Sequence, residues 1–202
     1  MIEPLGRRQF ICASAAGAVS ALGMADLPAR SLQASTGEHR GRIYKSVKFG
    51  MVRGKLSIEE KFELLKELGF DGVELNSPGG CNKKAALAAS KAVGLPIHGA
   101  VDSIHWGTRL SDPNPAVREK GRAGLETAVR DTHLVGGSSV LLVPGRVANK
   151  EKENQEQVWE RSIEQIRKVL PLSSRLGIHI LIENVWNGFC YVHNGPDNQT
   201  AD

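Results

Sequence analysis

The sequence predicts an α/β fold of the (β/α)8 barrel type, with about five of the eight βα units present. Short apolar segments alternate with longer amphipathic ones in units of roughly 30 residues, which is typical of parallel strands joined by covering helices. Residues 140–143 include no polar side chain, as expected of a strand buried on both faces. No GxGxxG or GxxxxGK(S/T) motif occurs, and this disfavours the nucleotide-binding doubly wound sheets that share the alternation.

The first unit is expected to begin with a strand at 47–52. A capping box follows, in which the Ser57 hydroxyl accepts a hydrogen bond from the backbone of Glu60 and the Glu60 carboxylate reaches back. Gly69 ends the helix that starts there. The apolar residues expected on one side of this helix are Phe62, Leu65 and Leu68.

The same criteria predict the next elements in chain order: a strand at 72–75, a helix at 83–93, a strand at 97–102 and a helix at 116–135. Gly94 and Pro96 end the first of these helices. The segment Asp112-Pro113-Asn114-Pro115 supplies residues that favour the start of the second.

A fourth strand is expected at 139–143, followed by a helix that Gly177 ends. This helix has apolar residues at positions i, i+4, i+7 and i+11, which indicates one buried face made of Trp159, Ile163, Ile166 and Leu170. The fifth strand, 179–184, is apolar and ends abruptly in Glu183 and Asn184.

The N-terminus is expected to be an export signal. Arg7 and Arg8 precede the weakly apolar run 11–24, an arrangement similar to a twin-arginine signal peptide. The run is too short to span the roughly 30 Å hydrocarbon core of a bilayer. We therefore assign 1–42 to a signal and linker and expect a periplasmic or extracytoplasmic protein without a membrane anchor after cleavage. The alternative is a chance arginine pair in an N-terminal arm.

Composition excludes several classes of protein. The net charge of +4 over 202 residues is too small to indicate a nucleic-acid surface, and aromatic residues make up only 5% of the chain. The three cysteines, Cys12, Cys81 and Cys190, form no CxxC or Cys/His grouping. Neither a zinc knuckle nor a disulfide framework is indicated.

Candidate functional residues are those at or after the C-terminal ends of the strands, because the catalytic residues of barrel enzymes lie there. Glu183 ends an otherwise apolar strand and is the first candidate for a catalytic base or metal ligand. Glu74 ends the second strand, and His105 and Trp106 follow the third; all three are candidates for substrate contacts. Each carboxylate has a structural alternative: Glu183 could pair with a neighbouring Lys or Arg, and Glu74 could form a salt bridge within the barrel mouth.

Other polar residues are expected to be structural. His98 and His179 begin their strands and so belong to the opposite, stability face of a barrel. Arg146 lies beyond the fourth strand, where a phosphate contact is conceivable but a solvated loop position is the simpler interpretation. The charged run 150–157 is expected to be a solvated helix start.

Three pieces of sequence narrow the family: Phe70-Asp71-Gly72-Val73-Glu74-Leu75, Val140-Leu141-Leu142-Val143-Pro144-Gly145 and Ile182-Glu183-Asn184-Val185-Trp186-Asn187-Gly188-Phe189. In their order and spacing they resemble the sugar phosphate isomerase/epimerase family of the xylose isomerase-like TIM-barrel superfamily. The resemblance covers roughly 45–189, and we assign 43–189 to a partial barrel of this kind.

The resemblance implies a divalent metal, Mn2+, Mg2+ or Co2+, held at the ends of strands five to eight. Glu183 matches the strand-five ligand and would also be catalytic, and Asn187 falls in a loop that lines the substrate pocket. The substrate would be a small-molecule ketose or sugar phosphate, isomerised or epimerised through an enediolate.

The tail 190–202 departs from the family, because it shows no apolar period and no counterparts of the later ligands. We expect a C-terminally truncated member, with assembly into a homo-oligomer possible through its open strand edges. The alternatives are an inactive sugar-binding remnant and, with less support, an apurinic endonuclease. The weak basicity of the chain argues against the last of these and against a nucleic-acid partner.

Overall fold

A computed structural model of the chain describes residues 41–183. Five parallel strands form one sheet in the order β1-β2-β3-β4-β5. The strands are β1 (Ser46–Lys48), β2 (Gly72–Ser77), β3 (Ile97–Asp102), β4 (Ser139–Leu142) and β5 (His179–Ile182). The helices are the 3-10 turn η1 (Phe49–Met51), α2 (Ile58–Glu67), α3 (Lys83–Val93), α4 (Pro115–Leu134) and α5 (Gln155–Leu176).

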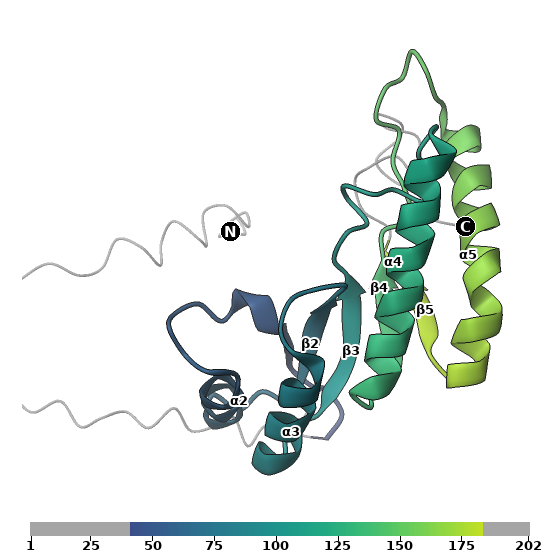
Figure 1. The fold of residues 1–202 in the computed structure, drawn as a ribbon. Coiled ribbons are helices and arrows are strands. Elements are labelled where there is room, and N and C mark those ends of the chain that lie inside the picture. The colour runs from purple at the N-terminus through teal and green to yellow at the C-terminus, as the bar shows by residue number, and fades with distance from the viewer. Residues whose placement is uncertain (1–40, 184–202) are drawn as a thin grey trace, which may run out of the picture. The chain divides into compact units, whose positions relative to one another are not determined.

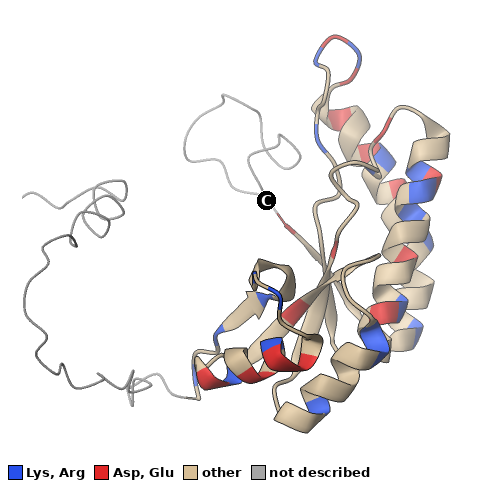
Figure 2. Ribbon diagram, turned by 60° about the vertical axis from the view of Figure 1, so that its left-hand side comes forward, with Lys and Arg blue, Asp and Glu red and all other residues tan. Residues whose placement is uncertain are grey.

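The helices cover one face of the sheet (Figures 1 and 2). Leu75, Ala100, Val140 and Ile180 are partners across four neighbouring strands, so their side chains share a face. Leu75 packs in a cluster with residues of α2 and α3, whereas Val140 packs with residues of α4 and α5. A sequential strand order with helices on one side is the wall of a barrel, whereas a doubly wound sheet reverses its order and carries helices on both faces. The predicted fold class is confirmed.

Local signals set the helix ends as expected. Ser57 and Glu60 form both bonds of the capping box at the start of α2. Gly94 and Gly177 cap α3 and α5 in the left-handed conformation, which glycine adopts without a steric penalty. No helix among residues 41–183 is long and apolar enough to cross a membrane.

Four strand ends differ from the prediction, and β4 and β5 end one and two residues earlier than expected, at Leu142 and Ile182. The expected first strand at 47–52 stops after Lys48, because Phe49–Met51 turn into η1 and bury the Phe49 ring against Phe62. β2 runs two residues further than expected, to Ser77, because Asn76 and Ser77 continue the ladder with β3.

The predicted buried faces of two helices need correction. On α5, Trp159 is 42% exposed and Leu170 46% exposed, whereas Val158, Ser162, Gln165 and Val169 are buried. The apolar pattern missed this face because two of its members are polar: Ser162 is buried by donating to the carbonyls of Pro144 and Val158. On α2, Phe62 and Leu65 are buried as predicted, but Leu68, the C-cap residue, is exposed.

Candidate functional site

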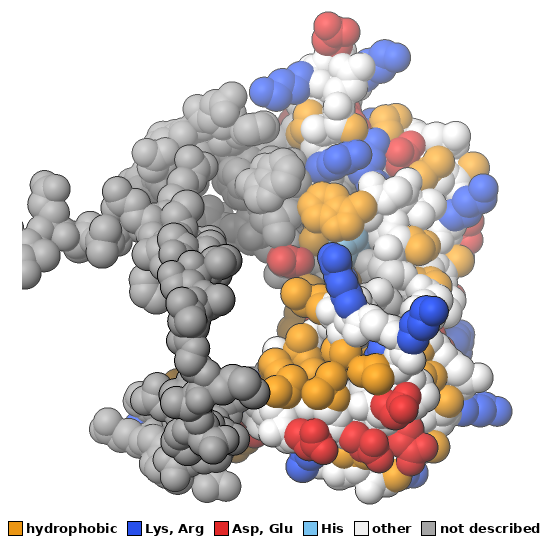
Figure 3. All heavy atoms as spheres, turned by 90° about the vertical axis from the view of Figure 1, so that its left-hand side faces the viewer, with side chains coloured by type: hydrophobic (Ala, Val, Ile, Leu, Met, Phe, Trp, Pro, Cys, Tyr) orange, Lys and Arg blue, Asp and Glu red, His pale blue; other side chains and the backbone are white. Residues whose placement is uncertain are grey.

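The parallel strands bring their C-terminal ends to one edge of the sheet, and the βα loops that follow them carry the candidate residues. Figure 3 shows a side of the molecule on which hydrophobic side chains gather across the middle and acidic ones gather below. Trp106, Met51 and Leu56 are exposed hydrophobic residues from these loops. His98 and His179 lie at the other ends of their strands, as predicted.

Glu74 and Glu183 share the face of the sheet that the helices leave open. Val73 and Leu75 pack under the helices, so strand alternation turns Glu74 the other way. Ile180 packs under the helices in the same manner, which turns Glu183 to the open face, and its N–H extends the ladder by donating to Leu142 O at 2.9 Å.

The electrostatics connect the two carboxylates. Burial raises the pKa of Glu74, the positive charges of His98 and Lys48 lower it, and the negative charge of Glu183 raises it further. Neither glutamate forms an ion pair within residues 41–183, so the salt-bridge alternative finds no partner there. The two carboxylates that the sequence singled out therefore face the same side of the sheet, on strands separated by β3 and β4, and the charge of Glu183 has only a minor effect on the pKa of Glu74.

His105 is buried in the β3–α4 loop, with 5% of its surface exposed. Its Nδ1 accepts a hydrogen bond from the Val143 N–H at 3.2 Å, which leaves Nε2 as the protonated ring nitrogen. Burial, with a smaller effect from Lys48, lowers the pKa of His105 to about 4. The imidazole is therefore neutral near pH 7, and its described geometry suits a hydrogen-bond donor better than a metal ligand through Nδ1.

Trp106 is adjacent to His105 and differs from it in exposure. The two rings meet edge to face with centroids 5.4 Å apart. Trp106 is 43% exposed, so part of the indole is open to a ligand. Arg146 is exposed in the β4–α5 loop, which agrees with the simpler interpretation of that residue.

Sequence reasoning missed Asp102, which ends β3 and is only 1% exposed. Its Oδ1 accepts the Ile104 N–H at 3.2 Å. Burial raises the pKa of Asp102 to about 6, an effect that this hydrogen bond partly offsets. The rule that singled out Glu183 and Glu74, an acid near a strand end, would also have found Asp102.

Asn76 was missed as well. Its Oδ1 is buried and has no hydrogen-bond partner among the described residues. It lies on a cavity of about 260 Å3 whose lining includes Phe49, Leu56, Lys61, Gly80 and Cys81. A buried acceptor without a partner is unfavourable unless a donor is supplied to it.

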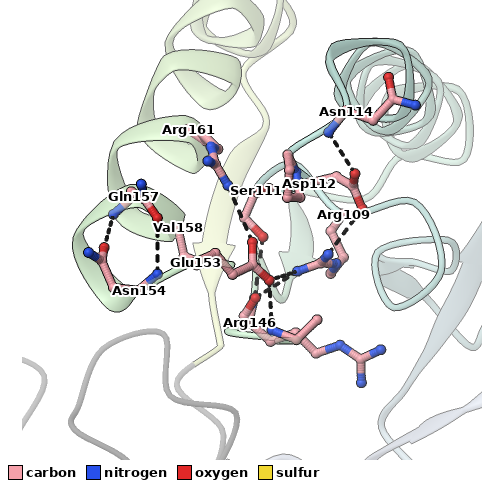
Figure 4. Close-up of polar contacts among 12 residues, drawn as sticks. Arg109, Ser111, Asp112, Asn114, Arg146, Glu153, Asn154, Gln157, Val158 and Arg161 are labelled. Carbon is pink, nitrogen blue, oxygen red and sulfur yellow. Dashed lines mark hydrogen bonds and ion pairs between the residues drawn. The ribbon is translucent and has the colours of Figure 1, made fainter. Parts of the chain in front are cut away.

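Glu153 corrects the prediction that 150–157 is fully solvated. It is 4% exposed and lies between two guanidinium groups, with Arg109 Nη1 at 3.0 Å and Arg161 Nη1 at 3.3 Å (Figure 4). The sequence pattern did not indicate this, because Arg109 is 44 residues from Glu153 and Arg161 is 8 residues from it. The cluster joins the β3–α4 loop to the β4–α5 loop.

The described residues do not form a metal site by themselves. Residues 41–183 contain no group of three His, Cys, Asp or Glu side chains placed to hold an ion. Glu183 is a single carboxylate at the expected strand end. Asn187 lies outside the described residues, as do residues 1–40 of the predicted signal and linker and the predicted tail at 190–202.

Comparisons with known proteins agree with the described fold. The solved structure of a 3-keto-D-glucoside 4-epimerase from E. coli is 20% identical, with a TM-score of 0.60 over 72% of this chain and 57% of that one. D-Psicose 3-epimerase from Clostridium cellulolyticum H10 is 17% identical, with a TM-score of 0.60 over 75% and 56%. D-Allulose 3-epimerase from Methylomonas sp. is 17% identical, with a TM-score of 0.55 over 69% and 50%.

These likenesses show a shared fold, and the chain spans 50% to 57% of the length of these three proteins. A comparison with curated protein sequences found no match. The model of the family described as xylose isomerase-like TIM barrel matches residues 62–202, well over half of the chain. The chain therefore belongs to the xylose isomerase-like TIM barrel family.

Proposed function

We propose that this chain belongs to a metal-dependent sugar or sugar phosphate isomerase or epimerase. The observation that carries the proposal is that Glu74 and Glu183 both face the open side of the sheet, where burial raises the pKa of Glu74 and the charge of Glu183 adds a smaller increase. Two interacting carboxylates of different environment suit proton transfer at a carbon next to a carbonyl. The structural neighbours named above are epimerases of ketoses or keto sugars, which supports this substrate class.

Each described residue has a proposed task. Glu183 takes the proton from the carbon next to the substrate carbonyl, which gives an enediolate, and the proton returns to the neighbouring carbon or to the other face of the same carbon. Glu74, with its raised pKa, holds a substrate hydroxyl. His105 donates from Nε2 to a substrate oxygen, and the exposed part of Trp106 covers the apolar side of the sugar. Asn187 is proposed to line the same pocket.

A divalent metal, Mn2+, Mg2+ or Co2+, is part of the proposal. Bound near the carbonyl, such an ion would polarise it as a Lewis acid. Glu183 would be one hard oxygen ligand, and the further ligands would lie outside residues 41–183. We also propose export through the arginine pair Arg7-Arg8.

Deuterium exchange tests the proposal directly. The full chain is incubated in D2O with D-fructose, D-psicose or D-tagatose and with Mn2+, and NMR follows the hydrogen next to the carbonyl. We expect metal-dependent incorporation of deuterium, lowered about 10²- to 10⁴-fold in Glu183→Gln, which is the usual contribution of a general base. Glu164→Gln, which removes an exposed carboxylate of α5, is the matched control and is expected to exchange normally.

A non-catalytic sugar-binding remnant is the second candidate, favoured by the lack of a three-ligand group among the described residues. Sugar binding without any deuterium incorporation would support it and refute the enzyme. Equal incorporation by the wild type and Glu183→Gln would remove Glu183 from the proposed chemistry.

A further inference from the structure

His105 depends on a loop that is distant in sequence. Its Nδ1 accepts from the N–H of Val143, which lies 38 residues further along the chain, at 3.2 Å. A neutral imidazole has one protonated nitrogen, and the hydrogen bond at the other nitrogen decides which one it is. The position of the Val143 amide therefore selects the tautomer of His105.

The segment that starts at Val143 is held by the buried carboxylate of Glu153. Glu153 Oε1 accepts the Ala148 N–H at 2.7 Å and the Arg109 guanidinium at 3.0 Å. Arg109 Nη1 also donates to the Arg146 carbonyl at 2.7 Å (Figure 4). Arg109 lies four residues after His105, so one carboxylate fixes both the loop that carries the imidazole and the loop that carries its donor.

Three further hydrogen bonds stabilise the same arrangement. Arg161 on α5 donates to Glu153 Oε2 at 3.3 Å, and also to the Ser111 carbonyl at 3.4 Å. Ser162 donates to the Pro144 carbonyl at 3.1 Å. Buried ion clusters of this kind contribute little net stability compared with apolar packing, because desolvation offsets much of the attraction. Their hydrogen bonds nevertheless fix a specific geometry, and here the bonds of Glu153, Arg109 and Ser162 hold the backbone of residues 143–148.

We propose that Glu153 is a positioning residue: through Arg109 and the backbone of residues 143–148, it keeps His105 in the Nε2–H tautomer, with a hydrogen-bond donor at the C-terminal edge of the sheet. The use of that donor on a sugar oxygen rests on the function proposed above, whereas the tautomer itself does not. The low pKa of His105, about 4, supports the arrangement because it keeps the ring neutral.

The tautomer is read by NMR on the full chain labelled with 15N-histidine. Long-range 1H–15N correlations distinguish the Nδ1–H and Nε2–H forms, and His105→Gln identifies its signals among the six histidines. We expect one Nε2–H form in the wild type near neutral pH. Glu153→Gln is expected to move the tautomer ratio at least about five-fold towards Nδ1–H, the change expected when one ordinary hydrogen bond is lost.

Asp131→Asn is the matched control. Asp131 is a partly buried carboxylate on α4 that accepts from Ser77 at 2.6 Å and pairs with Lys83 at 3.5 Å, so it holds the β2–α3 loop instead. This variant is expected to lose stability and to keep the wild-type ratio at His105. A ratio that changes equally in both variants would show a general loosening and overturn the inference.

A folded Glu153→Gln protein with the wild-type ratio would also overturn it. If Glu153→Gln does not fold, Arg161→Gln decides, because it removes only the more exposed partner of Glu153. A shift in the same direction supports the inference and an unchanged ratio refutes it. Since no substrate is present, a tautomer shift without any deuterium exchange would uphold this inference while refuting the proposed function.

Discussion

Replacing Asp102 with Asn tests whether burial at the end of β3 makes ionisation of the Asp102 carboxyl group unfavourable in the folded protein. The side chain is 1% exposed, and burial raises its pKa from the ordinary value of 3.8 to about 6. In the folded protein, ionisation of Asp102 is therefore unfavourable, whereas the unfolded chain ionises at the ordinary pKa. Asn keeps an oxygen that can accept the Ile104 N–H but has no charge to bury.

The expected magnitude follows from the shift of about two pKa units, at roughly 1.4 kcal/mol per unit, which gives about 3 kcal/mol. Wild-type Asp102 contributes its full stability below about pH 3.8 and loses it as the pH rises to about 6. Asp102→Asn should thus match the wild type near pH 4 and exceed it by about 3 kcal/mol above about pH 7.

Urea denaturation at a series of pH values measures this difference. With a typical slope of about 2 kcal/mol per M urea, the midpoint of Asp102→Asn should lie about 1.5 M above the wild type near pH 8 and converge with it near pH 4. Asp71→Asn, which removes an exposed carboxylate, controls for the change in net charge. A difference that does not vary with pH, or a variant less stable than the wild type near pH 8, would refute the reasoning.

Three further changes have clear expected outcomes. Glu183→Gln should lower the binding of Mn2+ measured by calorimetry as well as deuterium exchange, because an amide offers a hard cation no negative charge; unchanged metal affinity would show that Glu183 is structural. On α5, Leu172→Ala should lower the free energy of unfolding in urea by about 2–5 kcal/mol, because Leu172 is buried in the core. Leu170→Ala should lower it by about 1 kcal/mol or less, because Leu170 is 46% exposed. Equal losses would show that Leu170 lies on the buried face, as the apolar pattern predicts. Arg7→Lys combined with Arg8→Lys should keep the protein in the cytoplasm, as shown by cell fractionation, and normal export of that variant would contradict the signal assignment.

Much of the fold could be predicted from sequence because its signals are local. The α3 helix and the β3 strand begin and end at the predicted residues, since caps such as Gly94 and the apolar run of a buried strand act within a few residues. The alternation of strands and helices also fixed the C-terminal edge of the sheet as the place to look for Glu183, whereas Glu74 lies in the middle of β2 because that strand continues to Ser77.

Some of the site could not be predicted, because burial of a polar residue depends on partners far along the chain. Glu153 lies in a charged run that is expected to be solvated. It is nevertheless buried, because Arg109, 44 residues earlier, donates a hydrogen bond to its carboxylate. The same holds for the face of α5, where Ser162 is buried because the Pro144 carbonyl, 18 residues away, accepts its hydroxyl.

The sequence by itself determined that this chain forms βα units, in which order, and that Glu183 follows the fifth strand, because periodicity, capping residues and strand length are properties of neighbouring residues. Only the tertiary structure decided that Glu74 and Glu183 face the same open side of the sheet, that Asp102 is buried with a raised pKa, and that the Val143 amide fixes the protonated nitrogen of His105. The physical reason is that desolvation and electrostatic interaction depend on distances in space, and residues 38 or more apart in sequence acquire those distances only when the sheet assembles.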